Sequence, residues 1–544
     1  MKIIYMKNQL LLIVLFITIS GYKCSEKTVN NEIIRLGSNR ELFVDDYLIE
    51  RLSGKTELQM QHPTPQDIAL ETNEPWEGNG TGYVTVFKDS TKYRMYYRGR
   101  HISYLNGKDR PTTRNVYCYA ESQDGIHWIR PELGLFSYNG SKKNNIILDS
   151  GNESFSPFID TNPECMADAK YKALGITVGK KGLYAYKSSD GINWKLMDSV
   201  PVVTKGDFDS QNLAFWDELQ GEYRAYHRTF RGGAEGNWNL INSGSDKGRD
   251  IMTETSHDFL NWTDPVFLGY SAIVDPGNHN ALSVSAKDTA GKEYPSGRVS
   301  ELYTNQIIPY YRAPHLLIGF PTRYIDRGWT ESAKALPEYD YRYTRAKETR
   351  RLGTALTEGM IMSSRDRHNF RIWPEAFLRP GLRNKGSWFY GDMYQNWGIV
   401  ETSSAIEDAP PELSLYFLER GYRDRGSIIR RYNIRIDGFV SLHAPLVGGE
   451  MVTKPITFTG NTLFLNVSTS AAGSVRIEVQ DIDGRSLPGF SLADCHEIYG
   501  DNLERAVSWK ANPDLSTLAG KTVRLRFVIR DADIYSFVFL DRTH

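Results

Sequence analysis

Acidic, amide and aromatic side chains recur at the start of several strand-like segments that lie far apart in the sequence. Carboxylates that face one shared space can divide the work of glycosidic cleavage, in which one protonates the leaving oxygen and another attacks the sugar or activates water. Aromatic neighbours could stack on sugar faces. Alternatively, Asp209 and Glu301 are turn or solvent-facing residues. The segments are 76–77, 209–212, 301–305 and 394–397.

Four arginines recur at the end of a second set of strand-like, aromatic-rich segments, namely Arg98, Arg228, Arg323 and Arg420. A planar guanidinium can bind a carboxylate or sulfate through two hydrogen bonds at once. If these positions converge, they predict an anionic sugar as substrate. The alternative is that these arginines pair with acidic residues of the protein itself.

A repeated seven-residue motif predicts the elements that position these side chains. It reads SQDGIHW at 122–128 and SSDGINW at 188–194, with weaker copies at 256–262 and 364–370. Ser and Asp can hydrogen-bond the backbone of a hairpin turn, Gly permits a positive φ, and the aromatic residue packs the returning strand. The motif resembles the Asp-box of sialidases and other propellers, where it is structural. We therefore assign these aspartates no chemistry.

Two further strand-like runs precede each hairpin, so each repeat contains four strands. This pattern predicts an all-β protein with a five-bladed β-propeller over 39–446. The first strand of each blade lines the central channel, which would bring the polar segments together. Residues 41–48 alternate like a strand that could close the ring from the N-terminal side. The insertions at 231–247 and 326–351 are expected to be surface loops.

After residue 446 the sequence changes to short alternating strands, which predict a C-terminal β-sandwich over 447–544. This domain could bind glycan, but packing against the propeller as a structural domain is the favoured interpretation.

The N-terminal segment predicts export. Residues 1–23 place two lysines before an apolar run that is too short to span a bilayer, which is typical of a secretory signal. Cys24 follows directly and resembles the lipidated cysteine of a bacterial lipoprotein, with 24–38 as a tether. The alternative is simple cleavage of the signal. We expect an outer-membrane lipoprotein, periplasmic or at the cell surface, whose only membrane contact is this anchor.

Charge and cysteine content exclude several classes of function. The formal net charge of −1 disfavours binding to nucleic acid. Cys118, Cys165 and Cys495 are widely spaced, which fits neither a disulfide framework nor a metal site. The carboxylates and amides could coordinate Ca²⁺, but no loop has an ordered ligand spacing. We expect no metal and no cofactor.

The order of domains resembles family 32 and family 43 glycoside hydrolases. The phrases LFVDDYL at 42–48, FLRPG at 377–381, DGFVS at 437–441 and GFSLADC at 489–495 also resemble a group of exported bacterial proteins. The hydrolase families use a nucleophile or base, a second acid that orients the sugar, and a general acid. The resemblance implies Asp46, Asp209 and Glu301 for these roles, in that order. Glu77 is an alternative to Asp46, and Glu358 and Asp392 stay open.

The sequence therefore predicts an exo-acting glycoside hydrolase for a plant or algal polysaccharide fragment that carries carboxylate or sulfate groups. Retention or inversion of stereochemistry stays open. The main alternative is a non-catalytic, surface glycan-binding lipoprotein, and a sialidase-like enzyme is a third. The expected substrate-binding residues are Glu77, Arg98, Asn212, Arg228, Tyr303, Asn305, Arg323 and Gln395.

Overall fold

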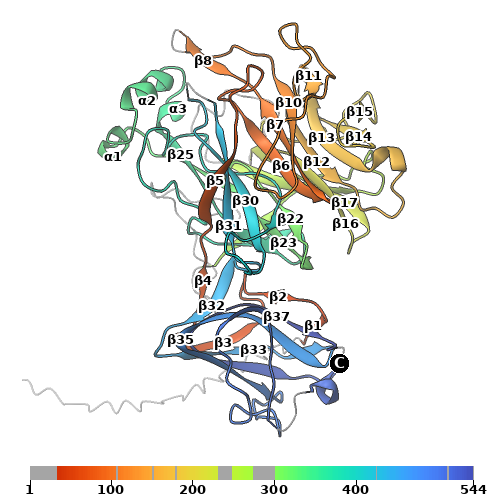
Figure 1. Ribbon diagram of the computed structural model, residues 1–544, viewed down its shortest axis with the longest axis vertical. Helices are drawn as coiled ribbons and strands as arrows, with labels where there is room; N and C mark the ends of the chain where they lie inside the picture. Colours follow the sequence, from red (N-terminus) through yellow and green to blue (C-terminus); the bar gives the residue numbers. More distant parts are fainter. Residues whose placement is uncertain are drawn as a thin grey trace, which may run out of the picture.

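The computed structural model shows an almost entirely β protein with two bodies, a larger one at the top of Figure 1 and a smaller one below it. The expected signal segment at 1–23 and Cys24 lie outside the described residues, as does the insertion at 231–247. Within the part of the chain that the structure describes, no helix is long and apolar enough to cross a bilayer. The structure describes residues 33–105, 108–149, 152–177, 181–230, 248–273, 300–423, 426–510 and 514–542.

The larger body contains three consecutive four-stranded antiparallel sheets, whose first strands lie on the inside. The first consists of β6 (Gly82–Asp89), β7 (Lys92–Gly99), β10 (Val116–Ser122) and β11 (Ile146–Asp149), with the hairpin β8 (Ile102–Leu105) and β9 (Lys108–Pro111) beside it. The second consists of β12 (Asn152–Ile159), β13 (Tyr171–Thr177), β14 (Leu183–Ser188) and β15 (Lys195–Leu196). The third consists of β16 (Leu213–Asp217), β17 (Glu222–Phe230), β18 (Arg249–Ser256) and β19 (Val266–Phe267).

The fourth sheet alternates along the chain with a shorter sheet, and the described α-helices lie between two strands of that shorter sheet. Its strands are β22 (Ile308–Tyr310), β23 (Ala313–Gly319), β26 (Met362–Ser364) and β27 (Asn369–Ile372), with β20 (Gly269–Ala272) added in parallel at the edge. The shorter sheet has three strands, which are β21 (Glu301–Leu302), β24 (Thr322–Asp326) and β25 (Ala355–Gly359). Along the chain they lie between strands of the fourth sheet. The expected loop at 326–351 instead holds α1 (Glu331–Lys334) and α2 (Tyr339–Ala346), followed by α3 (Arg351–Thr354).

An N-terminal strand completes the fifth sheet, but it is not the strand expected from the sequence. The sheet contains β28 (Tyr394–Gln395), β29 (Val400–Thr402), β30 (Glu412–Glu419) and β31 (Ile428–Ile434), and its outer strand is β5 (Thr64–Glu71). In Figure 1, β5 near the red end of the colour scale lies against the blue strands β30 and β31. The prediction that 41–48 closes the ring is therefore wrong.

Residues 41–48 belong to the smaller body, which is the β-sandwich. There β2 (Glu41–Leu42) pairs with the long strand β37 (Arg524–Leu540), and β3 (Ile49–Gly54) and β4 (Glu57–Met60) join the same sheet. The expected boundary at 446/447 is thus shifted, because the sandwich combines 34–60 with 440–540. Its other strands are β1 (Ile34–Gly37), β32 (Val440–Ala444), β33 (Gly449–Thr453), β34 (Ile456–Phe458), β35 (Thr462–Gln480) and β36 (Asp501–Ala506).

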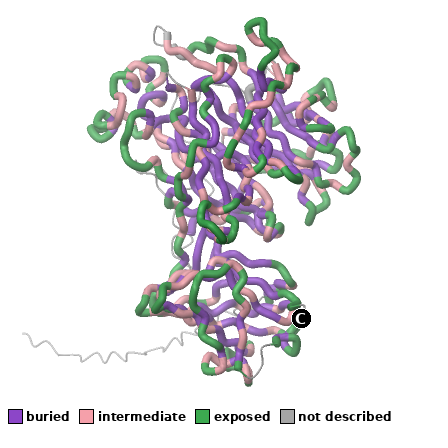
Figure 2. Tube along the Cα trace, in the orientation of Figure 1, coloured by how far each residue is buried: buried purple, intermediate pink, exposed green. Residues whose placement is uncertain are grey.

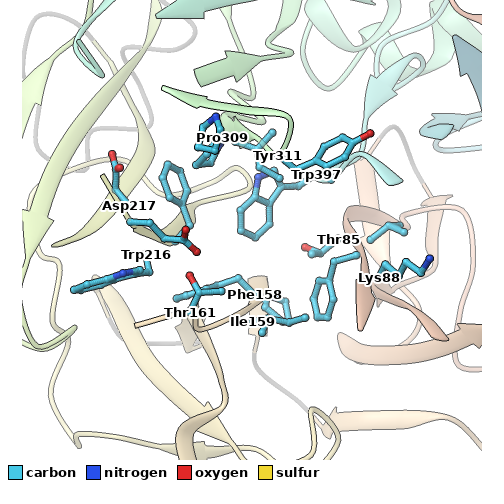
Figure 3. A pocket seen from close by; sticks show the side chains of 18 of the residues that line it. Thr85, Lys88, Phe158, Ile159, Thr161, Trp216, Asp217, Pro309, Tyr311 and Trp397 are labelled. Atoms are coloured by element: carbon cyan, nitrogen blue, oxygen red, sulfur yellow. The ribbon is translucent and has the colours of Figure 1, made fainter. Parts of the chain in front are cut away.

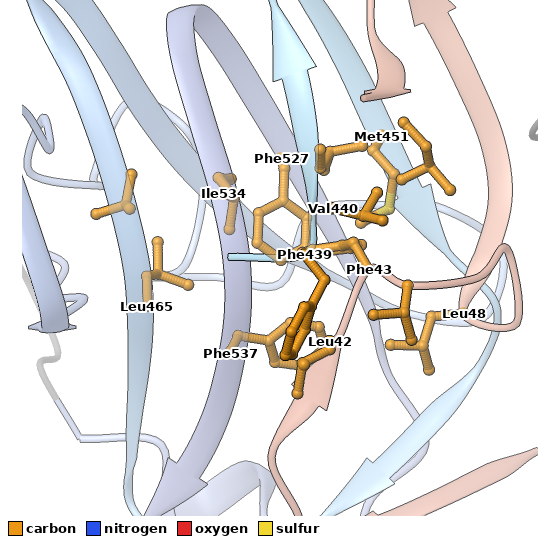
Figure 4. Packing of buried hydrophobic residues seen from close by; sticks show 14 of the residues in the cluster. Leu42, Phe43, Leu48, Phe439, Val440, Met451, Leu465, Phe527, Ile534 and Phe537 are labelled. Atoms are coloured by element: carbon orange, nitrogen blue, oxygen red, sulfur yellow. The ribbon is translucent and has the colours of Figure 1, made fainter. Parts of the chain in front are cut away.

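A continuous apolar core fills the sandwich and extends to the propeller. Phe43 from the N-terminal segment packs beside Phe537, while Phe439 reaches Tyr310 and Phe320 of the fourth sheet. Figure 4 shows the sandwich part of this packing, and Figure 2 shows that burial follows the strands while the connections are exposed. The burial of large aromatic side chains across this boundary fixes one body on the other.

The repeated motif forms the hairpin turn that the sequence predicts. In the first copy, Asp124 Oδ1 accepts the backbone N–H groups of Ile126 and His127 at 2.8 Å, and Gly125 has a φ of +74°. In the second copy burial opposes ionisation, but hydrogen bonds from Asn193 and the backbone lower the pKa of the aspartate to about 2. These carboxylates therefore stabilise turns.

Candidate functional site

Buried amide side chains fill the centre of the propeller, where the inner strands meet. The side chain of Gln306 donates to Gln211 Oε1 and to the backbone carbonyl of Gln395, both at 2.7 Å. Asn212 and Asn305 donate to backbone carbonyls at 2.9 and 3.3 Å. Both asparagines, which we expected to bind substrate, thus hold the channel wall. The side-chain nitrogen and oxygen of Gln395 are buried without a partner in the described part of the chain.

Two carboxylates converge on one buried arginine at the end of the channel where the inner strands begin. Arg228 of β17 is 1% exposed, and its Nη2 lies 3.7 Å from Asp207 and 3.6 Å from Asp209. The side chain of Asp209 is 37% exposed, so solvent reaches it. Burial raises the pKa of Asp207, Arg228 lowers it, and Asp209 raises it again, with a net increase. This pair contains one carboxyl whose pKa is raised and one that solvent reaches.

A third carboxylate lies beside this pair. Glu301 of β21 accepts hydrogen bonds from Arg249 Nη1 at 2.7 Å and from the Arg249 backbone N–H at 3.2 Å. The guanidinium carbon of Arg249 lies 5.4 and 5.2 Å from the ring centres of Phe230 and Tyr303. Arg228 lies 4.8 and 5.4 Å from the same two rings. The structure therefore brings Asp209 and Glu301 together, as expected from strands that open consecutive blades.

Tyrosines surround these ion pairs. The hydroxyls of Tyr303 and Tyr390 are 3.1 Å apart, and the Tyr390 ring stacks on Tyr422 at 5.9 Å with an interplanar angle of 1°. Burial opposes ionisation of Tyr390, but Arg351, Arg249 and the bond with Tyr303 hold its pKa below the usual value.

We call the complete group the acid–arginine cluster. It consists of Tyr83, Arg98, Asp207, Asp209, Arg228, Arg249, Glu301, Tyr303, Tyr324, Arg351, Tyr390, Tyr394 and Tyr422.

Asp46 and Glu77 do not belong to this cluster, so neither can act with Asp209 and Glu301. Asp46 lies between β2 and β3 of the sandwich and pairs with Arg371 of the outer strand β27 at 2.9 Å. Glu77 is buried behind the first sheet, where it accepts hydrogen bonds from Arg130 Nε at 2.8 Å and from the hydroxyl of Tyr97. Each carboxylate holds two parts of the protein together. These two assignments are corrected.

The expected arginine ring is only partly present. Arg228 belongs to the cluster, and so does Arg98, whose guanidinium carbon lies 4.6 Å from the ring centre of Tyr83. Arg323 instead donates to Glu358 at 2.8 Å and to a backbone carbonyl at 2.6 Å. It therefore follows the alternative interpretation of pairing within the protein.

Sequence reasoning missed seven members of the cluster, which are Tyr83, Asp207, Arg249, Tyr324, Arg351, Tyr390 and Tyr422. Arg249 opens β18 directly after the undescribed insertion, and Arg351 follows the helical insertion. A local signal existed only for Asp207, which lies two residues before Asp209 in the same blade opening.

No group of three or more His, Cys, Asp or Glu side chains among the described residues is arranged to hold a metal ion.

The opposite end of the channel holds a separate pocket of about 440 Å³. The ends of the inner strands of all five sheets line it, and aromatic rings of Phe158, Trp216, Tyr311 and Trp397 form much of the wall (Figure 3). Asp217 also lines this pocket and pairs with Arg367 at 2.9 Å. Of the two carboxylates in this wall, Asp217 is buried in that ion pair and Glu218 is exposed, so no single arginine holds the two together as Arg228 holds Asp207 and Asp209.

Comparison with known proteins gives distant similarities. No family model matches the chain. Uncharacterized proteins from two Mycobacterium tuberculosis strains are 24% identical over 155 residues, which are 27% of this chain and 44% of theirs, so the chain spans less than half the length of these relatives.

Three solved structures to which this chain is similar are described as enzymes that act on glycans. They include a glycosyl hydrolase from Bacteroides ovatus (TM-score 0.39, 13% identity, 68% of this chain and 94% of that one). A thermostable family-43 glycoside hydrolase has a TM-score of 0.37 at 13% identity and covers 69% and 96%. An N-acetylgalactosamine deacetylase from F. plautii in complex with blood group B trisaccharide has a TM-score of 0.38 at 10% identity. The match covers 70% of this chain and 96% of that one. Identities this low do not identify catalytic side chains.

Proposed function

We propose that this protein is a glycoside hydrolase whose active site is the acid–arginine cluster. The observation that carries the proposal is the pair of carboxylates, Asp207 and Asp209, held by one buried guanidinium at the mouth of the channel. Glycosidic cleavage needs one carboxyl that donates a proton and one that attacks or activates water. Different environments must separate their proton affinities. The cluster provides such a pair.

The two aspartates receive different roles in this proposal. Asp207 is the more buried, and its raised pKa suits a general acid. Asp209 is more exposed and suits the nucleophile or the base. Glu301 accepts two N–H groups from Arg249, which suits an ionised carboxylate rather than a proton donor. We therefore move the role of general acid from Glu301 to Asp207 and give Glu301 a positioning role.

The tyrosines and arginines define the kind of substrate. Tyrosine rings stack on sugar faces, and arginines bind carboxylate or sulfate groups. We propose exo-acting cleavage of a plant or algal polysaccharide fragment with anionic groups. Export with a lipid anchor at Cys24 completes this proposal.

The test uses the full chain and a panel of acidic and neutral plant and algal oligosaccharides, with mass spectrometry of the products. On a substrate that the wild type cleaves, Asp209→Asn and Asp207→Asn should each lower kcat by about 100-fold or more. Asp264→Asn is the control, because that side chain is 86% exposed and lies outside the cluster. Full activity in both Asn variants would refute the assignment. Saturable binding without products from any oligosaccharide would favour the non-catalytic glycan-binding protein instead.

A further inference from the structure

Arg351 is a member of the acid–arginine cluster without a carboxylate partner. Its Nε and Nη1 atoms are buried and have no hydrogen-bond partner in the described part of the chain. No Asp or Glu oxygen of the described residues lies within ion-pair distance of it, whereas Arg228 has two such partners and Arg249 has one. A buried guanidinium with unsatisfied donors is costly unless something pairs with it.

Aromatic rings form the surroundings of Arg351. Its guanidinium carbon lies 5.7 Å from the ring centre of Tyr390. The ring of Tyr324 packs edge-on against that of Tyr390, with 5.9 Å between the ring centres. The guanidinium carbon of Arg249 lies 4.3 Å from the Tyr324 ring centre, and the same guanidinium donates a hydrogen bond to Glu301. Arg351 therefore contacts the same group of tyrosine rings as Arg249, the arginine that binds Glu301.

The charges of this space are unbalanced. The four arginines of the cluster, Arg98, Arg228, Arg249 and Arg351, face three carboxyl groups, those of Asp207, Asp209 and Glu301. Because Nε and Nη1 of Arg351 are buried, an anionic oxygen that bonds to them gains more than it would in solvent.

We propose that Arg351 binds the carboxylate of a uronic acid residue in the substrate. This inference rests on the proposed function for its location, because it assigns a subsite of the same active site. A carboxylate is favoured over a sulfate because it is planar. A planar group can lie in the plane of the guanidinium between aromatic rings, whereas a tetrahedral sulfate projects toward them.

The experiment measures binding, so it does not depend on hydrolysis. The probes are trisaccharides of galacturonate and of glucuronate, their carboxyl-reduced neutral forms and 6-O-sulfated galactotriose, titrated calorimetrically into the full chain. The wild type should bind at least one uronate trisaccharide about 10- to 100-fold more tightly than its neutral form. Arg351→Gln should remove this preference, and Arg351→Lys should keep part of it because the positive charge remains.

Arg350→Gln is the matched control. Arg350 is the neighbouring residue, is 69% exposed and pairs with Asp326 at 2.9 Å, so the uronate preference should persist in this variant. Equal binding of uronate and neutral sugars by the wild type would overturn the proposal, as would a preference that survives in Arg351→Gln. Sulfated galactotriose binding as tightly as the uronates would refute the choice of carboxylate. Selective uronate binding with no cleavage of any oligosaccharide would refute the hydrolase while leaving this subsite in place.

Discussion

Asp392 is a buried carboxyl close in sequence to the proposed active site, and its ionisation should lower the free energy of unfolding. It follows Tyr390 by two residues, is fully buried, and accepts the backbone N–H of Gly421 at 3.0 Å. Its Oδ2 has no hydrogen-bond partner within the described residues. Burial raises its pKa to about 7, although Arg423, the Gly421 bond and Arg342 act in the opposite direction.

The sign and size of the effect follow from this shift. An unfolded Asp has a pKa of about 3.9, so the folded state favours the protonated form. The stabilisation is complete below about pH 4 and is lost as the pH rises through about 7. A difference of about 3 pH units corresponds to about 4 kcal/mol, of which about 3 kcal/mol should be lost between about pH 4.5 and about pH 8.5.

Asp392→Asn removes this titration and keeps the shape of the side chain and an oxygen for Gly421. The free energy of unfolding of the variant, relative to the wild type, should therefore increase by about 3 kcal/mol between the two pH values. Urea unfolding followed by tryptophan fluorescence measures it at both, with Asp264→Asn as the exposed control. A relative stability of Asp392→Asn that is the same at both pH values would refute the reasoning.

Two further predictions concern single buried groups. Tyr390→Phe should remove the tyrosine that ionises first in a spectrophotometric titration, because Arg351 and Arg249 hold its pKa below the usual value; an unchanged first phase would contradict this. Asp437→Asn should lower the free energy of unfolding by about 3 kcal/mol, because Asp437 is a fully buried, paired carboxylate. It accepts hydrogen bonds of 2.6 Å from the hydroxyls of Tyr310 and Ser536 and lies within 3.5 Å of Arg40 and Arg312. A loss below about 1 kcal/mol in denaturant unfolding would show that this ion cluster is dispensable.

The sequence was sufficient for the elements whose signal is local. The hairpin motif specifies its own turn through Ser, Asp and Gly, so the repeated sheets could be predicted without knowledge of the fold. Strand partners are set by distant residues, which is why the closing strand was misassigned. Residues 41–48 have a strand-like pattern and are buried at nearly every position, whereas β5 is mostly exposed along its first half and gives a weak pattern.

The same limit explains the candidate site. Asp209 and Glu301 could be predicted because each opens an inner or adjoining strand, and propeller geometry alone brings such positions together. The sequence around a carboxylate does not show whether it faces solvent or an arginine of another segment. Asp46 and Glu77 were therefore as suitable as Asp209 by sequence, although in the structure they pair with Arg371 and Arg130.

Arg351, by contrast, is a residue that the sequence did not indicate but the structure does. Its proposed role rests on the carboxylate partner that it lacks among the described residues, and such a lack is a property of three-dimensional packing. We predicted the other arginines because they recur at equivalent positions of the repeat. A residue that recurs in this way can have a structural role, as the ion pair of Arg323 with Glu358 shows. The unpaired charge instead follows an insertion that breaks the repeat. In a repeated fold, positions outside the repeat are released from the packing that every blade must satisfy, so substrate-specific contacts are expected there.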